Sequence, residues 1–495
     1  MLRLILGRAG SGKTTQVLQR LCRGGPDKRQ ILMVPEQQSH EAERALCRFG
    51  GDRVSLYAEV LSFSRLSNRV FLAAGGMGEP ELDAGGRILM MHRAVRSVAS
   101  QLTVYARPSR RPAFLEELLS TVDELKSCCV RPELLLQAGE EAGAGEGDKL
   151  HDLGLICTAY EALSARTALD PRDRLTRTAE KLRDCPWAQG ADLWLDGFTD
   201  FTPQQQEVLR ELLKQADTVT VTLTCDHLEE DEGGAGIFSP ARRTAAQLLR
   251  LAKQERIPGE VETLDGHDPA KAPELQIVER QLFAQERPEP VSCGGAVELF
   301  QASTPRAEVE RTAARIRELV RKEGYRYRDM GVVARDFSAY QPLIESVFPR
   351  YEIPVFSSAM TDILEKPILT LVTAALDTVA NGYRYDDVFR YLKTGLTDLS
   401  QEDQDLLENY VIKWNLRGSR WTQKKDWAMH PGGYGADWTK EDRALVKRLD
   451  RARRQVAEPL ELLRKNTNHT GWGQAIALYS FLEKIGLPER LEERV

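Results

Sequence analysis

Short apolar runs alternate with amphipathic stretches at the start of the chain. Residues 2–6 (LRLIL) and 31–34 (ILMV) are dominated by apolar side chains, and the stretch 14–23 between them places Val17, Leu18 and Leu21 on one helical face. Apolar runs of this length are typical of strands buried on both faces, whereas spacings of three and four residues are typical of a helix. The pattern predicts a parallel sheet covered by helices.

The pattern changes within the first 300 residues. Between about residue 85 and residue 183 helical spacing continues almost without interruption, and strand-like runs return at 193–196 and 218–224. We therefore predict one α/β domain formed by residues 1–84 and 184–286, divided by an all-helical insertion at 85–183. Two segments rich in glycine and acidic residues, 139–148 and 229–236, are predicted to be loops.

A second alternation begins after residues 287–295, whose proline and glycine content is typical of a linker. Apolar runs at 296–302, 330–334 and 352–356 enclose a long amphipathic stretch at 306–322. This arrangement predicts the start of a second α/β domain at 296–364. Residues 365–495 return to helical spacing, and we predict that they form a second helical insertion, cut short at residue 495.

Composition and charge narrow the function classes only slightly. The chain holds 68 Lys and Arg against 74 Asp and Glu, a net charge of -6, so any DNA-binding surface must be local. Eight scattered cysteines without a C-x-x-C pair argue against a zinc site or a disulfide framework. Without a signal peptide or an apolar run of about 18 residues, a cytoplasmic protein with no membrane contact is expected.

The segment 7–14 matches the phosphate-binding pattern G-x-x-x-x-G-K-[ST] at each fixed position. It lies between a predicted strand and a predicted helix, the context that the pattern requires; the alternative is a purely structural glycine-rich turn. Glycines let backbone N–H groups approach a β-phosphate, the lysine neutralises phosphate charge, and the threonine hydroxyl can ligate Mg²⁺. The residues predicted to bind ATP are Gly7, Arg8, Ala9, Gly10, Ser11, Gly12, Lys13, Thr14 and Thr15.

A second strand end is the candidate metal position. The run 193–195 is followed by Asp196 and Gly197, so Asp196 is predicted to hold Mg²⁺ together with Thr14. Gly197 stands where a motor enzyme would carry the glutamate that orients the attacking water, so we identify no catalytic residue and predict slow hydrolysis. The alternative is a strand that ends in a simple Asp-Gly turn. Only six residues precede the phosphate loop, which leaves the nucleotide base weakly specified.

Several segments, taken in order, resemble AddB (also called RexB), the B subunit of a bacterial ATP-dependent helicase-nuclease. Besides the phosphate loop, the matching segments are 34–37 (VPEQ), 43–46 (ERAL), 60–66 (VLSFSRL), 195–198 (LDGF), 201–203 (FTP), 332–335 (VVAR), 351–354 (YEIP), 392–396 (LKTGL) and 407–410 (LENY). Each segment is short, and their ordered occurrence gives the resemblance its specificity.

The resemblance implies a fold, partners and cofactors. It implies RecA-like, superfamily 1 helicase-like domains with large helical insertions, a heterodimer with an AddA-type helicase, and double-strand break processing for homologous recombination. Such a subunit reads single-stranded DNA, including the Chi hotspot, and is not the motor. The family's C-terminal half carries an exonuclease domain with a four-cysteine iron-sulfur cluster, whose ligands and nuclease motif are not in this chain.

Candidate contacts to single-stranded DNA pair basic side chains with flat rings. A loop after the second strand and the segment 62–65 supply an amide, a ring and a cation, and the segment 413–427 interleaves basic residues with three tryptophans. The alternative is that these rings belong to helical cores. The predicted DNA-binding residues are Gln37, Phe63, Arg65, Arg335, Lys393, Trp414, Arg417, Arg420 and Trp421.

Two other functions remain open at this point. An autonomous superfamily 1 helicase would hydrolyse ATP and translocate, for which the sequence offers no catalytic carboxylate after Asp196. A P-loop small-molecule kinase would also begin with the phosphate loop, but the chain length and the two predicted α/β domains argue against it.

Overall fold

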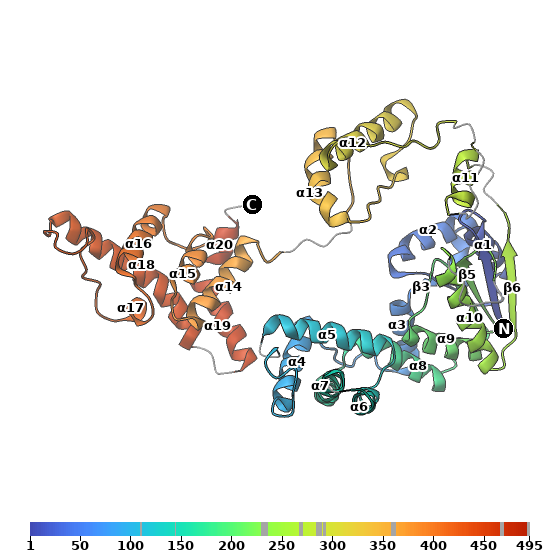
Figure 1. Ribbon diagram of the computed structural model, residues 1–495, viewed down its shortest axis with the longest axis horizontal. Helices are drawn as coiled ribbons and strands as arrows, with labels where there is room; N and C mark the ends of the chain where they lie inside the picture. The colour runs from blue at the N-terminus through green and yellow to red at the C-terminus, as the bar shows by residue number, and fades with distance from the viewer. Residues whose placement is uncertain are drawn as a thin grey trace. The chain divides into compact units, whose positions relative to one another are not determined.

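A computed structural model gives the structure of the protein and describes residues 1–108, 111–143, 145–228, 236–266, 271–283, 290, 294–357, 363–465 and 470–492 (Figure 1). The chain divides into two compact units, Met1–Phe300 and Gln301–Val495, and each is treated by itself. Most of the predicted linker 287–295 and of the predicted loop 229–236 lies outside the described residues.

The first unit is built on a six-stranded sheet in which every pairing is parallel. The strand order is β3-β2-β4-β5-β1-β6. The strands are β1 (Leu2–Gly7), β2 (Gln30–Met33), β3 (Ala58–Leu61), β4 (Asp192–Leu195), β5 (Thr218–Thr224) and β6 (Gly259–Leu264). The predicted parallel α/β sheet is therefore confirmed, and strands from either side of residues 85–183 pair in one sheet.

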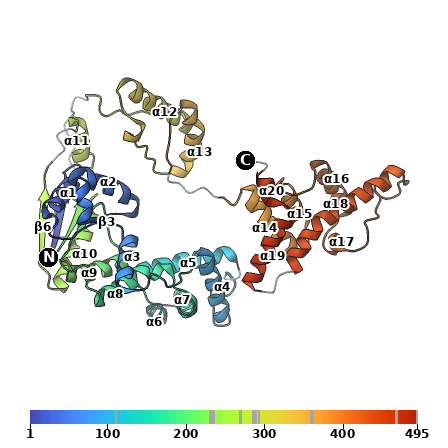
Figure 2. The ribbon, with the colours of Figure 1, turned by 180° about the vertical axis from the view of Figure 1, so that it is seen from behind.

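Helices cover both faces of this sheet (Figures 1 and 2). Successive side chains of β2 point to opposite faces, so that Ile31 and Met33 enter one core while Leu32 enters the other. On the face that contains Leu32, α1 (Lys13–Gly24) and α2 (Ser39–Gly50) pack against the sheet. On the face that contains Met33, the packing helices are α3 (Phe63–Ala74), α8 (Arg174–Asp184), α9 (Pro203–Gln215) and α10 (Ser239–Gln254). A further short helix, α11 (Pro273–Gln281), follows β6.

Four helices between the third and fourth strands form a core of their own. They are α4 (Ala84–Val98), α5 (Pro112–Ser127), α6 (Pro132–Glu141) and α7 (Glu146–Thr167). Met91, Ala94, Ile156 and Tyr160 are among the fully buried members of this core. Helix α8 lies within the predicted insertion 85–183, yet Ala179 and Leu182 pack in the core of the sheet.

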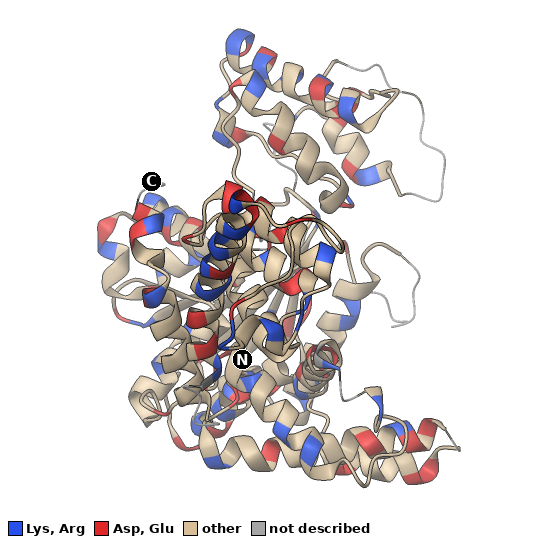
Figure 3. Cartoon of the chain, turned by 90° about the vertical axis from the view of Figure 1, so that its left-hand side faces the viewer, with Lys and Arg blue, Asp and Glu red and all other residues tan. Residues whose placement is uncertain are grey.

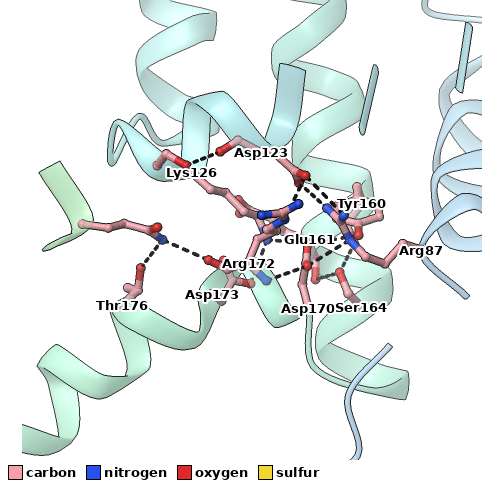
Figure 4. A network of polar contacts seen from close by, with 12 residues as sticks. Arg87, Asp123, Lys126, Tyr160, Glu161, Ser164, Asp170, Arg172, Asp173 and Thr176 are labelled. Carbon is pink, nitrogen blue, oxygen red and sulfur yellow. Dashed lines mark hydrogen bonds and ion pairs between the residues drawn. The ribbon is translucent and has the colours of Figure 1, made fainter. Parts of the chain in front are cut away.

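A buried ionic network connects the four-helix core with the chain that returns to the sheet (Figure 4). Asp170 lies at its centre with a fully buried side chain, 2.9 Å from Lys126 Nζ and 3.1 Å from Arg87 Nε. The hydroxyl of Tyr160 donates a further hydrogen bond of 3.0 Å to Asp170. Gln204, at the start of α9, donates to the backbone oxygen of Arg172 at 3.0 Å, which extends the network to the sheet domain.

In the part of the second unit that the structure describes, helices joined by loops are the only regular secondary structure. Helices α12 (Pro305–Lys322) and α13 (Phe337–Val347) pack through Val309, Ala313, Ile344 and Val347. The segments 296–302, 330–334 and 352–356, which the apolar pattern predicts to be strands, carry no strand assignment. Their apolar side chains include the almost fully exposed Leu299, Val333 and Phe356. A strand needs a hydrogen-bonded neighbour, which an apolar pattern cannot supply by itself.

The rest of the second unit is the predicted run of helices after residue 365. It consists of α14 (Pro367–Ala380), α15 (Tyr385–Leu392), α16 (Gln401–Trp414), α17 (Ser419–Thr422), α18 (Lys440–Lys465), α19 (Gly471–Lys484) and α20 (Leu487–Glu492). Their shared core includes the fully buried Leu392, Trp421, Leu460 and Phe481. Among the described helices of the whole chain, none has the length and apolar character that crossing a membrane requires.

Candidate functional site

The phosphate-loop segment joins β1 to α1 at the carboxyl edge of the sheet. Gly7 ends β1 and Lys13 begins α1. Gly10 and Gly12 have φ values of 82° and 86°, in the left-handed region where a side chain would be strained. A Cβ on Gly7 would collide with the Ser11 hydroxyl. The glycines of the motif are therefore required by backbone conformation and by close approach.

The first turn of α1 is prepared for a negative charge. Gly12, at the N-cap, offers no side-chain acceptor, and the turn contains no acidic residue. The first N–H groups of a helix have no intrahelical partner and carry a partial positive charge, so an anion placed there is stabilised. Thr14 and Thr15 are exposed in this turn, as are Ala9, Gly10 and Gly12 in the loop before it.

Lys13 folds back over the loop. Its Nζ donates to the backbone oxygens of Gly7 at 2.6 Å and Arg8 at 2.9 Å. Burial lowers the pKa of Lys13, while the nearby carboxylates of Asp196 and Glu279 act in the opposite direction. The ammonium group is thus held in the loop that the motif assigns to phosphate binding.

Asp196 meets the first turn of α1 from another strand. The Thr14 hydroxyl donates to Asp196 Oδ2 at 2.7 Å, and the Thr222 hydroxyl donates to the other carboxylate oxygen. Because β5 lies between β1 and β4, Asp196 reaches Thr14 across the end of β5, where Thr222 belongs to the strand. The structure therefore brings together the two residues predicted to hold Mg²⁺.

The oxygen chemistry of Thr14 and Asp196 fits Mg²⁺. This ion is usually held by one or two carboxylates, a few water molecules and substrate phosphates, and needs no cage of protein ligands. The described residues contain no cluster of three or more His, Cys, Asp or Glu side chains that could bind a metal ion alone.

Gly197 has a structural reason to lack a side chain. Its φ is +82°, and a Cβ there would lie 2.5 Å from Gln38 Oε1 and 3.4 Å from Pro35 Cδ. Gln38, from the short helix η1 (Glu36–Gln38) after β2, therefore occupies the space beside Asp196. The sequence showed the missing carboxylate, but Gln38 was not recognised, because a contact between residues 38 and 197 leaves no local signal.

Arg8 joins the phosphate loop to α11. Its Nε is 2.8 Å from Glu279 Oε1, and its terminal nitrogen donates to the backbone oxygen of Glu279 at 2.6 Å. The guanidinium also lies over the ring of Phe238, 5.0 Å from its centroid. Glu279 was likewise not predicted, since it lies 271 residues from Arg8 in the sequence.

Comparison with known proteins places this chain. A model of the family described as "ADDB, N-terminal" matches residues 4–279, which include the phosphate loop, Asp196 and α11. The chain belongs to the AddB family.

Curated AddB relatives are similar over the whole chain. The B subunit of the ATP-dependent helicase/deoxyribonuclease of Acetivibrio thermocellus is 35% identical over 512 residues, covering 100% of this chain and 44% of the relative. The proteins of the same name from Pelotomaculum thermopropionicum and Clostridium tetani are 36% and 32% identical, each covering 99% of this chain and 44% of the relative. The chain thus spans less than half the length of these relatives.

Three of the residues predicted to bind DNA lie near the same edge of the sheet. Gln37 is exposed on η1. Phe63 is only 7% exposed and packs edge-on against Phe198, with ring centroids 5.7 Å apart. Arg65 is half-exposed and lies 2.5 Å from Glu43 Oε1. Phe63 is therefore a core ring in this structure, whereas Gln37 and Arg65 are accessible.

A groove of about 590 Å³ runs along this edge. Its walls come from the ends of β2, β3 and β4 and from the start of α8 and α9. Polar lining residues include Ser62, Ser64, Arg172, Arg174, Thr202 and Gln205. The groove combines hydroxyl, amide and guanidinium donors beside the aromatic core formed by Phe63 and Phe198.

The remaining DNA candidates lie in the second unit. Trp421 is fully buried, and Trp414 is half-buried with its indole N–H donating to the His430 backbone oxygen at 3.1 Å. Both rings serve the helical core, which was the alternative interpretation of this segment. Arg417 and Arg420 are exposed.

Two candidates remain outside that cluster. Arg335 is exposed. Lys393 is also exposed, but its ammonium group lies 2.7 Å from Glu408 Oε1. The sequence therefore located basic surface residues in this unit but left the role of the rings open, since burial depends on the packing of distant helices.

Proposed function

We propose that this AddB-family chain is the helicase-like part of a protein that binds ATP and single-stranded DNA, within a helicase-nuclease that processes double-strand breaks for homologous recombination. The observation that carries the proposal is the meeting of Thr14 and Asp196 at 2.7 Å beside the Lys13 loop. This arrangement supplies backbone donors, a lysine and an oxygen pair at one point, which a Mg²⁺-bound triphosphate requires.

The strand order supports a RecA-like assignment for the first unit. The phosphate-loop strand β1 and the Asp196 strand β4 are separated by β5. In an open parallel sheet ligands bind outside the carboxyl ends of the strands, where Lys13, Thr14 and Asp196 gather. ATP with Mg²⁺ is the ligand that we propose for this place.

The site is proposed to hold ATP without driving a motor. Hydrolysis requires a group that orients the attacking water, and the position after Asp196 carries a glycine, whose φ of +82° would strain a glutamate placed there. ATP would then stabilise the protein and its grip on DNA, while a partner subunit performs translocation.

The DNA part of the proposal uses the carboxyl edge of the same sheet. The groove near Gln37 and Arg65 offers polar donors for nucleotide edges, and Arg172 and Arg174 supply charge for phosphates. We propose that single-stranded DNA lies here, where the Chi hotspot would be read. In the second unit, taken by itself, we propose Arg417 and Arg420 as phosphate contacts.

A partner subunit follows from the names of the relatives. Each of them is named as one lettered subunit of a helicase/deoxyribonuclease, which implies at least one other subunit, and we propose an AddA-type helicase. Nuclease activity and the iron-sulfur cluster are proposed for proteins of the relatives' full length and are not assigned to residues of this chain.

Substitution of the loop lysine tests the nucleotide site. Lys13→Ala removes the only cation that folds over the loop backbone in the described site, so calorimetric titration with ATP and Mg²⁺ is expected to show no measurable binding. Lys253→Ala, on the exposed side of α10, is the matched control and should bind as the wild type does. Equal ATP affinity in the wild type and Lys13→Ala would refute the site.

A second function, an autonomous helicase motor, would use the same loop and Asp196. The motor function differs from the ATP-holding function in requiring rapid turnover of ATP, so the rate of ATP hydrolysis distinguishes the two functions.

A further inference from the structure

Helix α11 contacts the phosphate loop through the acidic residue Glu279. A negative charge is unexpected beside a proposed phosphate-binding site. The carboxylate of Glu279 is 20% exposed, lies 2.8 Å from Arg8 Nε and is near enough to Lys13 to act on its pKa. A negative charge beside the triphosphate site opposes ATP binding, since like charges in a partly buried site repel more strongly than in water.

Arg8 is held by Glu279 although it belongs to the nucleotide motif. Two hydrogen bonds, of 2.8 Å and 2.6 Å, fix its guanidinium to the side chain and backbone of Glu279. A guanidinium group can make two parallel hydrogen bonds to a phosphate, just as it does to a carboxylate. When a nucleotide binds, Arg8 can therefore pair either with its phosphates or with Glu279.

Among the described residues, α11 makes few buried contacts. No residue of α11 is fully buried, and Leu275 and Val278 are 39% and 38% exposed. By contrast, α10 buries five residues against the sheet. An element with few buried apolar contacts opens at low free energy, so the contacts of Arg8 form a large share of the attachment of α11.

We propose that Arg8 and Glu279 form a nucleotide-operated latch: an incoming triphosphate takes Arg8 from Glu279, and α11 is released from the phosphate loop. This inference rests on the proposed ATP site and adds a means of regulation to it. Binding and release are thermodynamically linked, so whatever frees α11 also tightens the grip on ATP.

The latch makes opposite predictions for its two members. Glu279→Gln keeps the size of the side chain but removes the repelling charge, and ATP should bind at least about 5-fold more tightly, the lower end of ordinary coupling between sites. Arg8→Ala removes the cation that would transfer to phosphate while leaving Glu279 charged, and ATP should bind more weakly. A purely structural ion pair would shift both variants in the same direction, whereas fixed charges without a latch would shift them oppositely but leave the hydrogen exchange of α11 unchanged by ATP.

The experiment measures ATP-Mg²⁺ affinity by calorimetry and amide hydrogen exchange of residues 273–281, using the whole chain. Glu262→Gln is the matched control, because Glu262 pairs with Arg20 at 2.6 Å in the same unit but is not among the charges acting on Lys13. The latch predicts that ATP accelerates exchange in α11 of the wild type, and that Glu279→Gln exchanges rapidly before ATP is added.

Two failures are distinguishable. If neither the wild type nor Glu279→Gln binds ATP, the proposed nucleotide site itself is wrong. If both bind ATP equally well, or if ATP leaves the exchange of α11 unchanged, the site stands and the latch is refuted.

Discussion

Gly197 shows how one backbone position limits the chemistry of the nucleotide site. Its left-handed φ would strain a side chain directly after Asp196, and Gln38 would have to move to make room for one. Asp196 itself is bound by two hydroxyl groups, one from α1 and one from β5. The proposed ion and phosphate site thus has no carboxylate in the position that would activate water.

We predict that Gly197→Glu will destabilise the fold and will not create an ATPase. The left-handed backbone and the contact with Gln38 should destabilise the fold by about 1–3 kcal/mol, seen as a lower denaturation midpoint in urea. Gly78→Glu, at an exposed glycine with free space around its Cα, is the control and should leave the midpoint nearly unchanged. An unaltered midpoint for Gly197→Glu would contradict the account.

At the residue scale the sequence predicted local motifs but not their tertiary partners. The loop 7–14 was recognisable because its spacing is determined by the backbone around a phosphate. Glu279 and Gln38 were missed because they reach the loop and Asp196 through the fold. Phe63 was ambiguous for the same reason, since neither burial nor its contact with Phe198 is encoded nearby.

At the scale of elements, four of the buried strands were predictable, whereas the short buried strand β3 and the exposed strand β6 were not. Strands β1, β2, β4 and β5 are continuous apolar or β-branched runs between helices. Strand β6 (GEVETL) is a polar edge strand with mostly exposed residues and gave no such signal. The runs 296–302, 330–334 and 352–356 gave the signal but carry no strand assignment.

The network around Asp170 is the element that joins the four-helix core to the sheet domain. Burial by itself would raise the pKa of Asp170, but Lys126, the backbone N–H of Arg172 and Arg87 together lower it. Because the pKa is lower in the folded state than the ordinary value of 3.8, the carboxylate stabilises the fold above that pH. This contribution disappears as the pH falls further, through the folded-state pKa.

Asp170→Asn should therefore cost about 3–5 kcal/mol at pH 7, the usual effect of leaving buried cations without their partner. Urea denaturation at pH 7 and pH 3 measures the change, and the difference between variant and wild type should shrink at the lower pH. Asp173→Asn is the control: its side chain is 40% exposed although it also pairs with Lys126, so a smaller loss is expected. A cost for Asp170→Asn that is independent of pH would contradict the network's role.

For the whole molecule, charge is distributed without a dominant sign. Lys and Arg are interleaved with Asp and Glu along the chain, in keeping with the net charge of -6 (Figure 3). The proposed binding to DNA would then depend on local groups such as Arg417 and Arg420, which are exposed. Such binding is expected to weaken with salt, because each phosphate contact releases bound counterions.

We predict that the affinity for a single-stranded oligonucleotide falls steeply between low and moderate salt. The double substitution Arg417→Ala, Arg420→Ala should reduce the slope of log affinity against log salt by about 0.7 for each phosphate that is no longer neutralised. Arg448→Ala is the control, because Arg448 is engaged with Glu402 and Asp403. If the wild-type affinity does not respond to salt, the proposed DNA contacts are wrong.

At the scale of the whole molecule, the proposed function is to hold ATP while another chain acts as the motor. Its most direct test is the rate of ATP hydrolysis by the 495-residue chain at saturating ATP and Mg²⁺, with and without single-stranded DNA. We predict saturable ATP binding with turnover well below about 1 per second, the low end of ordinary enzymes, and little stimulation by DNA. DNA-stimulated turnover above that rate would contradict the account and identify the chain as a motor.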